Sequence, residues 1–250
     1  MCGACGGKQP KNLRTKSAVE QAPTTYPIPT AYEVTRLINE AGAAFVIGIT
    51  NPMENVDTYL TDAKKAVNIG IYGADLAYVS TYNLEQATRN YIKALHTLTN
   101  DLHISTQINN SLIQQIEQNI DNKDTVISII SRSFDDTYSF LVNNGQDDVS
   151  LLVLAGTWIE GMYIATYLAT TSENAENLLP IVARQLTSLN TLLDLLNASQ
   201  NADIQPVAKK IKDIQSLFIE ISDQKALDKK GAQQLRDKIE GLRNEYVAAV

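Results

Sequence analysis

Two acidic residues of this chain stand among tyrosines in segments that are otherwise apolar. Asp75 follows Tyr72 by three residues and precedes Tyr78 and Tyr82 by three and seven. These spacings place the four side chains on one face of a helix. A carboxylate on such a face has to be hydrogen-bonded, because burying it without partners costs several kcal/mol. The pattern therefore predicts a polar cluster that either binds a ligand or holds helices together.

A second stripe repeats the first. Glu160 shares a helix face with Thr157, Tyr163 and Tyr167. Residues 75–82 align without gaps with residues 160–167, and both tyrosines and the threonine are identical. The offset of 85 residues is a plausible length for a unit of several helices. An internal repeat of this kind would give the protein two similar halves, with Asp75 and Glu160 placed alike in each.

Three interpretations of the two carboxylates remain open. In the first, both stripes line one pocket, where the acids and aromatic rings bind a polar or cationic small molecule. In the second, tyrosine hydroxyls or an arginine satisfy two structural carboxylates between packed helices; the candidates are Arg36, Arg89 and Arg132. In the third, burial raises the pKa of Asp75 or Glu160, which then acts as a general acid or base.

Other catalytic chemistry finds no support in the sequence. Only two histidines are present, His96 and His103, and neither has the glutamate three residues earlier that di-iron sites of helical bundles use. Nucleophile elbows and glycine-rich phosphate loops are also absent. We expect no cofactor and no metal. The 21 basic and 28 acidic residues give a net charge of −7, which argues against nucleic-acid binding.

The two cysteines, Cys2 and Cys5, lie in a polar segment, residues 1–29, whose net charge is +3. With so few apolar residues, this segment is predicted to be a flexible tether. A redox site would need a preceding strand, and a zinc site would need further ligands, so an uninvolved tail is the simpler alternative. Cys2 also suits lipid attachment in a mature bacterial lipoprotein, although no apolar signal sequence precedes it.

The rest of the chain, residues 30–250, is predicted to form one all-α domain. No proline occurs between Met53 and Leu179, and apolar residues recur at steps of three and four. This pattern favours a compact bundle of about ten helices over a sheet. The expected helices span residues 30–41, 53–68, 71–83, 84–102, 105–120, 123–143, 147–171, 175–198, 203–222 and 225–248.

Two segments need a separate interpretation. Residues 44–50 are the one strand-like run, and because a lone strand has no pairing partner we predict a buried connection or helix end. Residues 151–169 carry a single charge, Glu160, and approach the length of a membrane span. Because a carboxylate in mid-bilayer is unfavourable, we predict instead the central helix of a soluble bundle.

Three segments, Tyr72–Tyr78, Asn144–Asp147 and Ala155–Gly161, resemble a group of uncharacterised Bacteroidetes lipoproteins. The resemblance runs from about Thr30 to the C-terminus. It implies a cleaved signal sequence, lipid attachment at Cys2 and an all-helical domain facing the periplasm, but no activity. We therefore expect a non-enzymatic cell-envelope domain that binds a small molecule or a partner protein and meets the membrane only through its anchor. An enzyme using a buried carboxylate and a purely structural module are the alternatives.

Overall fold

The described part of the chain consists of helices and their connections. A computed structural model describes residues 26–104, 106–224 and 226–248, and no strand occurs among them. In chain order the elements are α1 (Ala31–Glu40), the 3-10 helix η1 (Met53–Thr58), α2 (Asp62–Thr81), α3 (Glu85–Asp101), α4 (Thr106–Gln118), α5 (Lys123–Asn143), α6 (Asp147–Thr171), α7 (Ala175–Ala198), α8 (Ile204–Gln224) and α9 (Lys229–Val247). The predicted all-α fold is confirmed.

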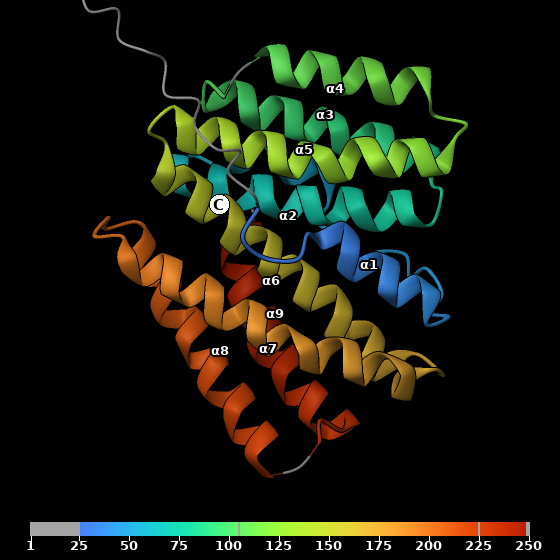
Figure 1. Ribbon diagram of the computed structural model, residues 1–250, viewed down its shortest axis with the longest axis vertical. Coiled ribbons are helices and arrows are strands. Elements are labelled where there is room, and N and C mark those ends of the chain that lie inside the picture. The colour runs from blue at the N-terminus through green and yellow to red at the C-terminus, as the bar shows by residue number, and fades with distance from the viewer. Residues whose placement is uncertain (1–25, 105, 225, 249–250) are drawn as a thin grey trace, which may run out of the picture.

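Helices α2 to α5 and helices α6 to α9 form two groups (Figure 1). In each group the first helix packs against the second and the fourth: α2 against α3 and α5, and α6 against α7 and α9. The two groups meet mainly through their first helices, α2 and α6, which form the most extensive contact among the described elements. The internal repeat expected from the sequence stays a prediction. Asp75 and Glu160 both lie on the helices that join the groups.

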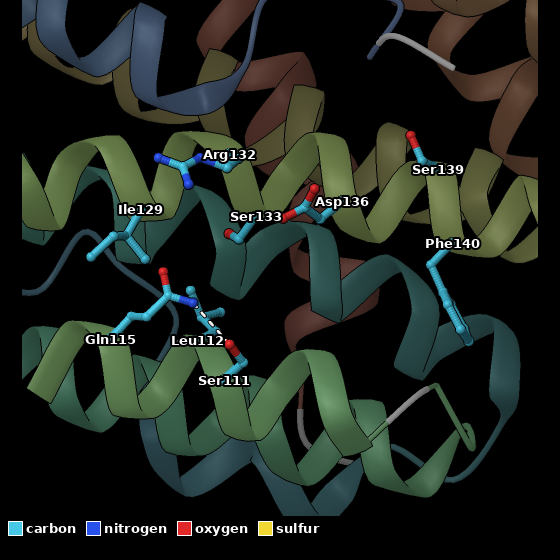
Figure 2. Close-up of a pocket in the computed structure, with 9 residues that line it drawn as sticks. All are labelled: Ser111, Leu112, Gln115, Ile129, Arg132, Ser133, Asp136, Ser139 and Phe140. Carbon is cyan, nitrogen blue, oxygen red and sulfur yellow. Dashed lines mark hydrogen bonds between the residues drawn. The ribbon is translucent and has the colours of Figure 1, made fainter. Parts of the chain in front are cut away.

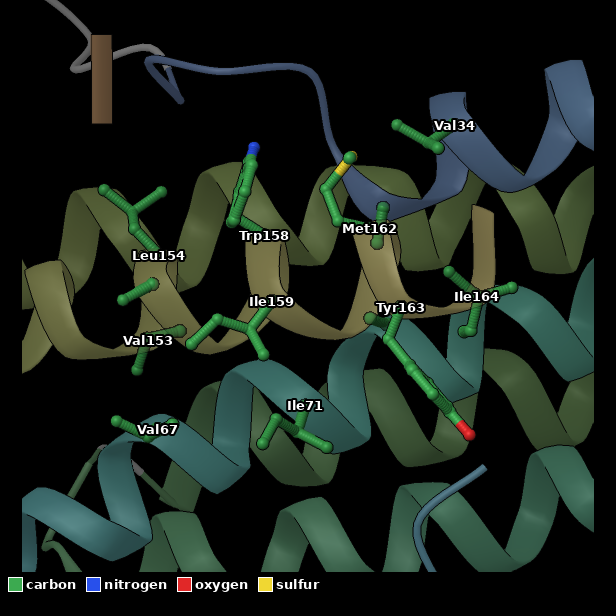
Figure 3. Packing of buried hydrophobic residues seen from close by; sticks show 14 of the residues in the cluster. Val34, Val67, Ile71, Val153, Leu154, Trp158, Ile159, Met162, Tyr163 and Ile164 are labelled. Atoms are coloured by element: carbon green, nitrogen blue, oxygen red, sulfur yellow. The ribbon is translucent and has the colours of Figure 1, made fainter. Parts of the chain in front are cut away.

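A pair of glycines allows α2 and α6 to approach closely. A Cβ atom on Gly70 would lie 2.5 Å from the backbone nitrogen of Thr157, and one on Gly156 would lie 2.8 Å from the carbonyl carbon of Val67. Only glycine fits there, because any side chain would overlap the backbone of the opposite helix. The apolar side chains around this contact include Val67, Ile71, Val153 and Ile159 (Figure 3).

Helix α6 is the centre of the fold. By length and composition it could cross a membrane, since its most apolar window has a mean hydropathy of 1.4. In the fold, however, 89% of that window is buried, chiefly under α2, α7 and α9. The neighbouring helices therefore cover the apolar surface that the sequence shows, and α6 is a core helix.

Two predicted helix boundaries are wrong, and the first concerns α2. The sequence suggested a break between residues 68 and 71, but α2 runs through Gly70 without interruption. The break lies at residues 59–61, where the Thr61 hydroxyl accepts a hydrogen bond from the backbone N–H of Lys64 and caps the helix. The low helix propensity of glycine is outweighed at this position by the close packing that it permits. Helix α9 also begins later than expected, at Lys229.

The last four residues of the predicted tether belong to the fold. Tyr26 and Ile28 are only 8% and 5% exposed. The backbone N–H of Tyr26 donates to Oδ1 of Asp135 on α5 at 3.2 Å. The tether prediction is therefore wrong for residues 26–29, because burying these two large apolar side chains favours docking over mobility. The remainder of that segment, residues 1–25, lies outside the described residues.

The strand-like run, residues 44–50, is an irregular connection, but the prediction that it is buried is wrong, because only Ile49 within it is buried. It belongs to residues 41–52, which lead from α1 towards η1. Its burial is uneven, because Ile49 is 4% exposed whereas Ile47 is 89% exposed. Irregular backbone in contact with a core has many unpaired N–H and C=O groups, so partners for this connection have to come from elsewhere in the fold.

Candidate functional site

The two predicted acids meet at the interface of α2 and α6. Asp75 and Glu160 are both 0% exposed. Their carboxyl groups lie close enough for the charge of Glu160 to act on Asp75. The close approach of the two helices at Gly70 and Gly156 brings the acids together from positions far apart in the sequence.

An arginine of α9 neutralises Glu160. The Nε atom of Arg243 donates to Oε2 of Glu160 at 2.5 Å, and its Nη2 atom donates to Oε1 at 2.8 Å. The Nη2 atom also donates to the carbonyl oxygen of Ile49 at 3.2 Å. Arg243 is only 6% exposed, and its guanidinium lies 4.4 Å from the ring centroid of Tyr163. The charge of Glu160 is thus balanced inside the protein by a bidentate pair.

The arginines that the sequence suggested do not take this role. Arg36 forms an exposed pair with Glu40 on α1, at 2.6 Å. A signal for the true partner was present in α9, where Ile239, Arg243 and Val247 recur every four residues. Arg243 therefore occupies a core-facing position of an otherwise apolar stripe, which marks it as a buried charge in need of a carboxylate.

Asp75 is the second acid of the cluster and has no cation of its own. Its Oδ2 atom accepts a hydrogen bond from the backbone N–H of Asn51 at 2.9 Å, and its Oδ1 atom has no hydrogen-bond partner among the described residues. Burial, and then the charge of Glu160, raise the pKa of Asp75 well above its ordinary value. One guanidinium balances one carboxylate, so the charge balance favours a protonated Asp75 beside an ionised Glu160.

Asp75→Asn should make the stability of the protein less sensitive to pH. Below the ordinary carboxyl pKa of 3.8 both folded and unfolded chains hold the proton, so the variant and the wild type should differ least. As the pH rises, the unfolded chain releases this proton while the folded protein retains it. The wild type then loses stability relative to the variant by at most about 1.4 kcal/mol per pH unit, until the raised pKa is passed. Chemical unfolding of both proteins between about pH 4 and 8 measures this difference, and a constant difference contradicts the prediction.

Asn51 links the acidic cluster to the surrounding elements. Its side-chain amide donates to the hydroxyl of Tyr59 at 2.9 Å and to Oδ1 of Asn68 at 3.2 Å. Asn68 on α2 in turn donates to the carbonyl oxygen of Tyr246 at the end of α9, at 3.1 Å. Asn51 and Asn68 are both 0% exposed. Sequence reasoning missed both asparagines; the position of Asn68 inside an apolar helix was the available signal.

The tyrosines of the first stripe fasten the irregular connection after α1. Their hydroxyls bond its backbone: Tyr72 donates to the carbonyl of Pro52 at 2.8 Å, Tyr78 accepts from the N–H of Val46 at 2.9 Å, and Tyr82 donates to the carbonyl of Ala43 at 2.7 Å. These bonds satisfy backbone groups that the connection cannot pair internally. All three tyrosines therefore have partners within the protein.

The second stripe is also occupied by protein groups. The Thr157 hydroxyl donates to the carbonyl of Val153 within α6, at 3.0 Å. The guanidinium of Arg243 covers the ring of Tyr163, and that of Arg236 covers the ring of Tyr167 at 4.0 Å from its centroid. Cations do lie against these aromatic rings, but they are arginines of α9 and not a ligand.

The contacts favour the interpretation of Asp75 and Glu160 as structural carboxylates. The hydrogen bonds and the balancing charge come from Asn51 and Arg243, which occupy the places that a ligand would need. A general acid or base also has to reach its substrate, whereas both carboxyl groups are 0% exposed. The cluster is built to hold α2, α6, α9 and the α1–η1 connection together.

Space for a ligand occurs elsewhere, between α4 and α5. A groove of about 470 Å³ is lined by Ser111, Leu112, Gln115, Ile129, Arg132, Ser133, Asp136, Ser139 and Phe140 (Figure 2). This volume falls within the range of small-molecule sites. Gln115 donates to the Ser111 hydroxyl at 2.8 Å along α4. Arg132 and Asp136, one turn apart on α5, form no ion pair within the part of the chain that the structure describes.

Sequence reasoning did not predict this groove. Its residues come from two helices, and helical spacing does not show which face of one helix meets the other. Comparison with known proteins adds no relative, since no family model, no curated protein and no solved structure matches the chain. The groove therefore has to be interpreted from its own chemistry.

Proposed function

We propose that the protein is a non-enzymatic, lipid-anchored domain of the cell envelope that binds a small polar molecule in the groove between α4 and α5. The observation that carries the binding proposal is the pair Arg132 and Asp136, which face a 470 Å³ groove without an ion-pair partner among the described residues. Lipid attachment at Cys2 is supported by the sequence of the polar segment ahead of the domain.

The lining of the groove favours a zwitterionic ligand. A guanidinium such as that of Arg132 binds carboxylates and phosphates through two parallel hydrogen bonds. The carboxylate of Asp136 favours a cationic group at a distance of about one helical turn. Hydroxyl and amide groups of Ser111 and Gln115 on the facing helix can donate or accept hydrogen bonds as the ligand requires. A molecule with an anionic and a cationic end therefore matches both walls.

Phosphocholine is the simplest probe of this site. Titration should shift the amide resonances of α4 and α5, and Arg132→Ala should weaken binding about tenfold or more, because a charge-assisted hydrogen bond is lost. Arg184→Ala is the matched control, since Arg184 is an exposed arginine of α7 outside the groove. Equal affinities of the two variants, or no saturable binding, would overturn the assignment of the groove.

The anchor is tested separately from the groove. When the protein is produced with its native upstream sequence, mass spectrometry should find a lipid-modified N-terminal cysteine at Cys2 in the membrane fraction. Cys2→Ser should release the protein from that fraction. If Cys2 is unmodified in a protein produced with its native upstream sequence, the envelope proposal is contradicted. The binding proposal for the groove is not affected by this result.

A further inference from the structure

A second, apolar cavity lies directly behind the groove. It has about 60 Å³ of free space among α2, α3, α4, α5 and α6. The side chains of Leu112 on α4 and Ser133 on α5 line both the groove and this cavity. They therefore form the partition between a polar space outside and an apolar space inside.

The wall of the inner cavity is mostly hydrocarbon. Its apolar side chains include Leu76, Leu95, Leu112, Phe134 and Leu141. Most of the surface of this wall is apolar, although hydroxyl-bearing residues also contribute to it, namely Tyr26, Thr99, Ser133, Thr137, Tyr138 and Ser150. Predominantly apolar space of this kind accepts apolar ligands. The inner cavity therefore suits the apolar part of a molecule whose polar part occupies the groove.

Tyr26 is also part of the wall of the inner cavity. Its ring packs edge-on against Phe134 and Tyr138 of α5, with centroids 5.9 Å and 5.7 Å away. Tyr26 is 8% exposed, and its hydroxyl lies near that of Thr157 without forming a hydrogen bond of ordinary geometry.

We infer that the ligand of the groove is a zwitterionic amphiphile, with its head at Arg132 and Asp136 and a short alkyl chain that passes Leu112 into the apolar cavity. This inference rests on the proposed function of the groove. Leu112 is only half-buried, so its side chain has room to move aside and admit a chain. The polar head group of the ligand determines where it binds, and its alkyl chain adds affinity.

The test is a series of phosphocholines with increasing alkyl chains, each below its micelle concentration. Affinity should rise about fourfold for each added methylene until the cavity is full, and then level off. Leu95→Ala should move this plateau to longer chains, and Leu95→Phe should move it to shorter ones. Leu95 suits the purpose because it lines the cavity but not the groove and is only half-buried, so neither variant should prevent folding.

The outcomes separate this inference from the function on which it rests. Both Leu95 variants should bind phosphocholine itself like the wild type. If phosphocholine binds through Arg132 but affinity does not grow with chain length, the amphiphile inference is overturned and the groove remains a polar site. The inference is also overturned if affinity grows with alkyl-chain length but levels off at the same length in the wild type and in both Leu95 variants. The alkyl chain would then lie outside the cavity. If the wild type binds neither phosphocholine nor its alkyl derivatives, both the amphiphile inference and the proposed function of the groove are overturned.

Discussion

Gly156→Ala should lower the free energy of unfolding by about 3 kcal/mol or more, the upper end of what overpacking usually costs. The new methyl group would overlap the backbone of Val67 on α2, whose carbonyl carbon would be only 2.8 Å away. A side chain could rotate aside, but a helix backbone cannot yield without moving the whole α2–α6 contact. Gly70→Ala should behave similarly, because its methyl group would meet the backbone of Thr157.

Gly161→Ala is the matched control for this prediction. Gly161 is also a buried glycine within α6, but a Cβ atom there would have no neighbour within 4 Å. Alanine should leave stability unchanged or raise it by up to about 1 kcal/mol, since it restricts the unfolded chain and favours the helix. Urea unfolding of the three variants measures the difference. Equal stability of the Gly156 and Gly161 variants would show that the two helices do not touch at Gly156.

Glu160→Gln should lower the free energy of unfolding by about 3–5 kcal/mol, because it leaves a buried guanidinium without its counter-charge. Arg243 is 6% exposed and cannot regain water without opening the interface of α9. Glutamine keeps the shape of the side chain, so the loss reports the charge and not a cavity. Chemical unfolding at neutral pH gives the value directly.

A control and a second variant make this prediction specific. Glu240→Gln removes another arginine pair of α9, with Arg236 at 3.7 Å, where the carboxylate is 37% exposed; it should cost at most about 1 kcal/mol. Asp75 can replace part of the missing charge by ionising, so Glu160→Gln should be more damaging in the Asp75→Asn background than alone. A loss no larger than that of Glu240→Gln contradicts a buried ion pair, and strictly additive effects contradict the coupling of the two acids.

Several features of the fold could be read from local sequence patterns. The helices α5, α6 and α7 have the predicted bounds, because turn residues at 121–124 and 143–148 and the apolar spacing act within a few residues of each other. The helix faces that carry Asp75 and Glu160 also follow from local spacing. The break predicted near Gly70 was wrong because the reason for that glycine lies 86 residues away, at Gly156.

The partners of the two acids could not be predicted in this way. Glu160 and Arg243 are 83 residues apart, and Asn51 is 24 residues from Asp75. Helical spacing shows which side chains share a face of one helix but not which faces meet. The sequence accordingly predicted a need for partners, and it suggested the wrong arginines.

The sequence by itself determined an all-α chain with two acids on apolar helices, because helix formation and amphipathic spacing are local properties. The tertiary structure alone decided that these acids face each other, that Arg243 and Asn51 complete them, and that free space lies between α4 and α5. The reason is physical: the choice of packing partners depends on the fit of whole helix surfaces, as at Gly70 and Gly156, and this fit joins residues that no local pattern connects.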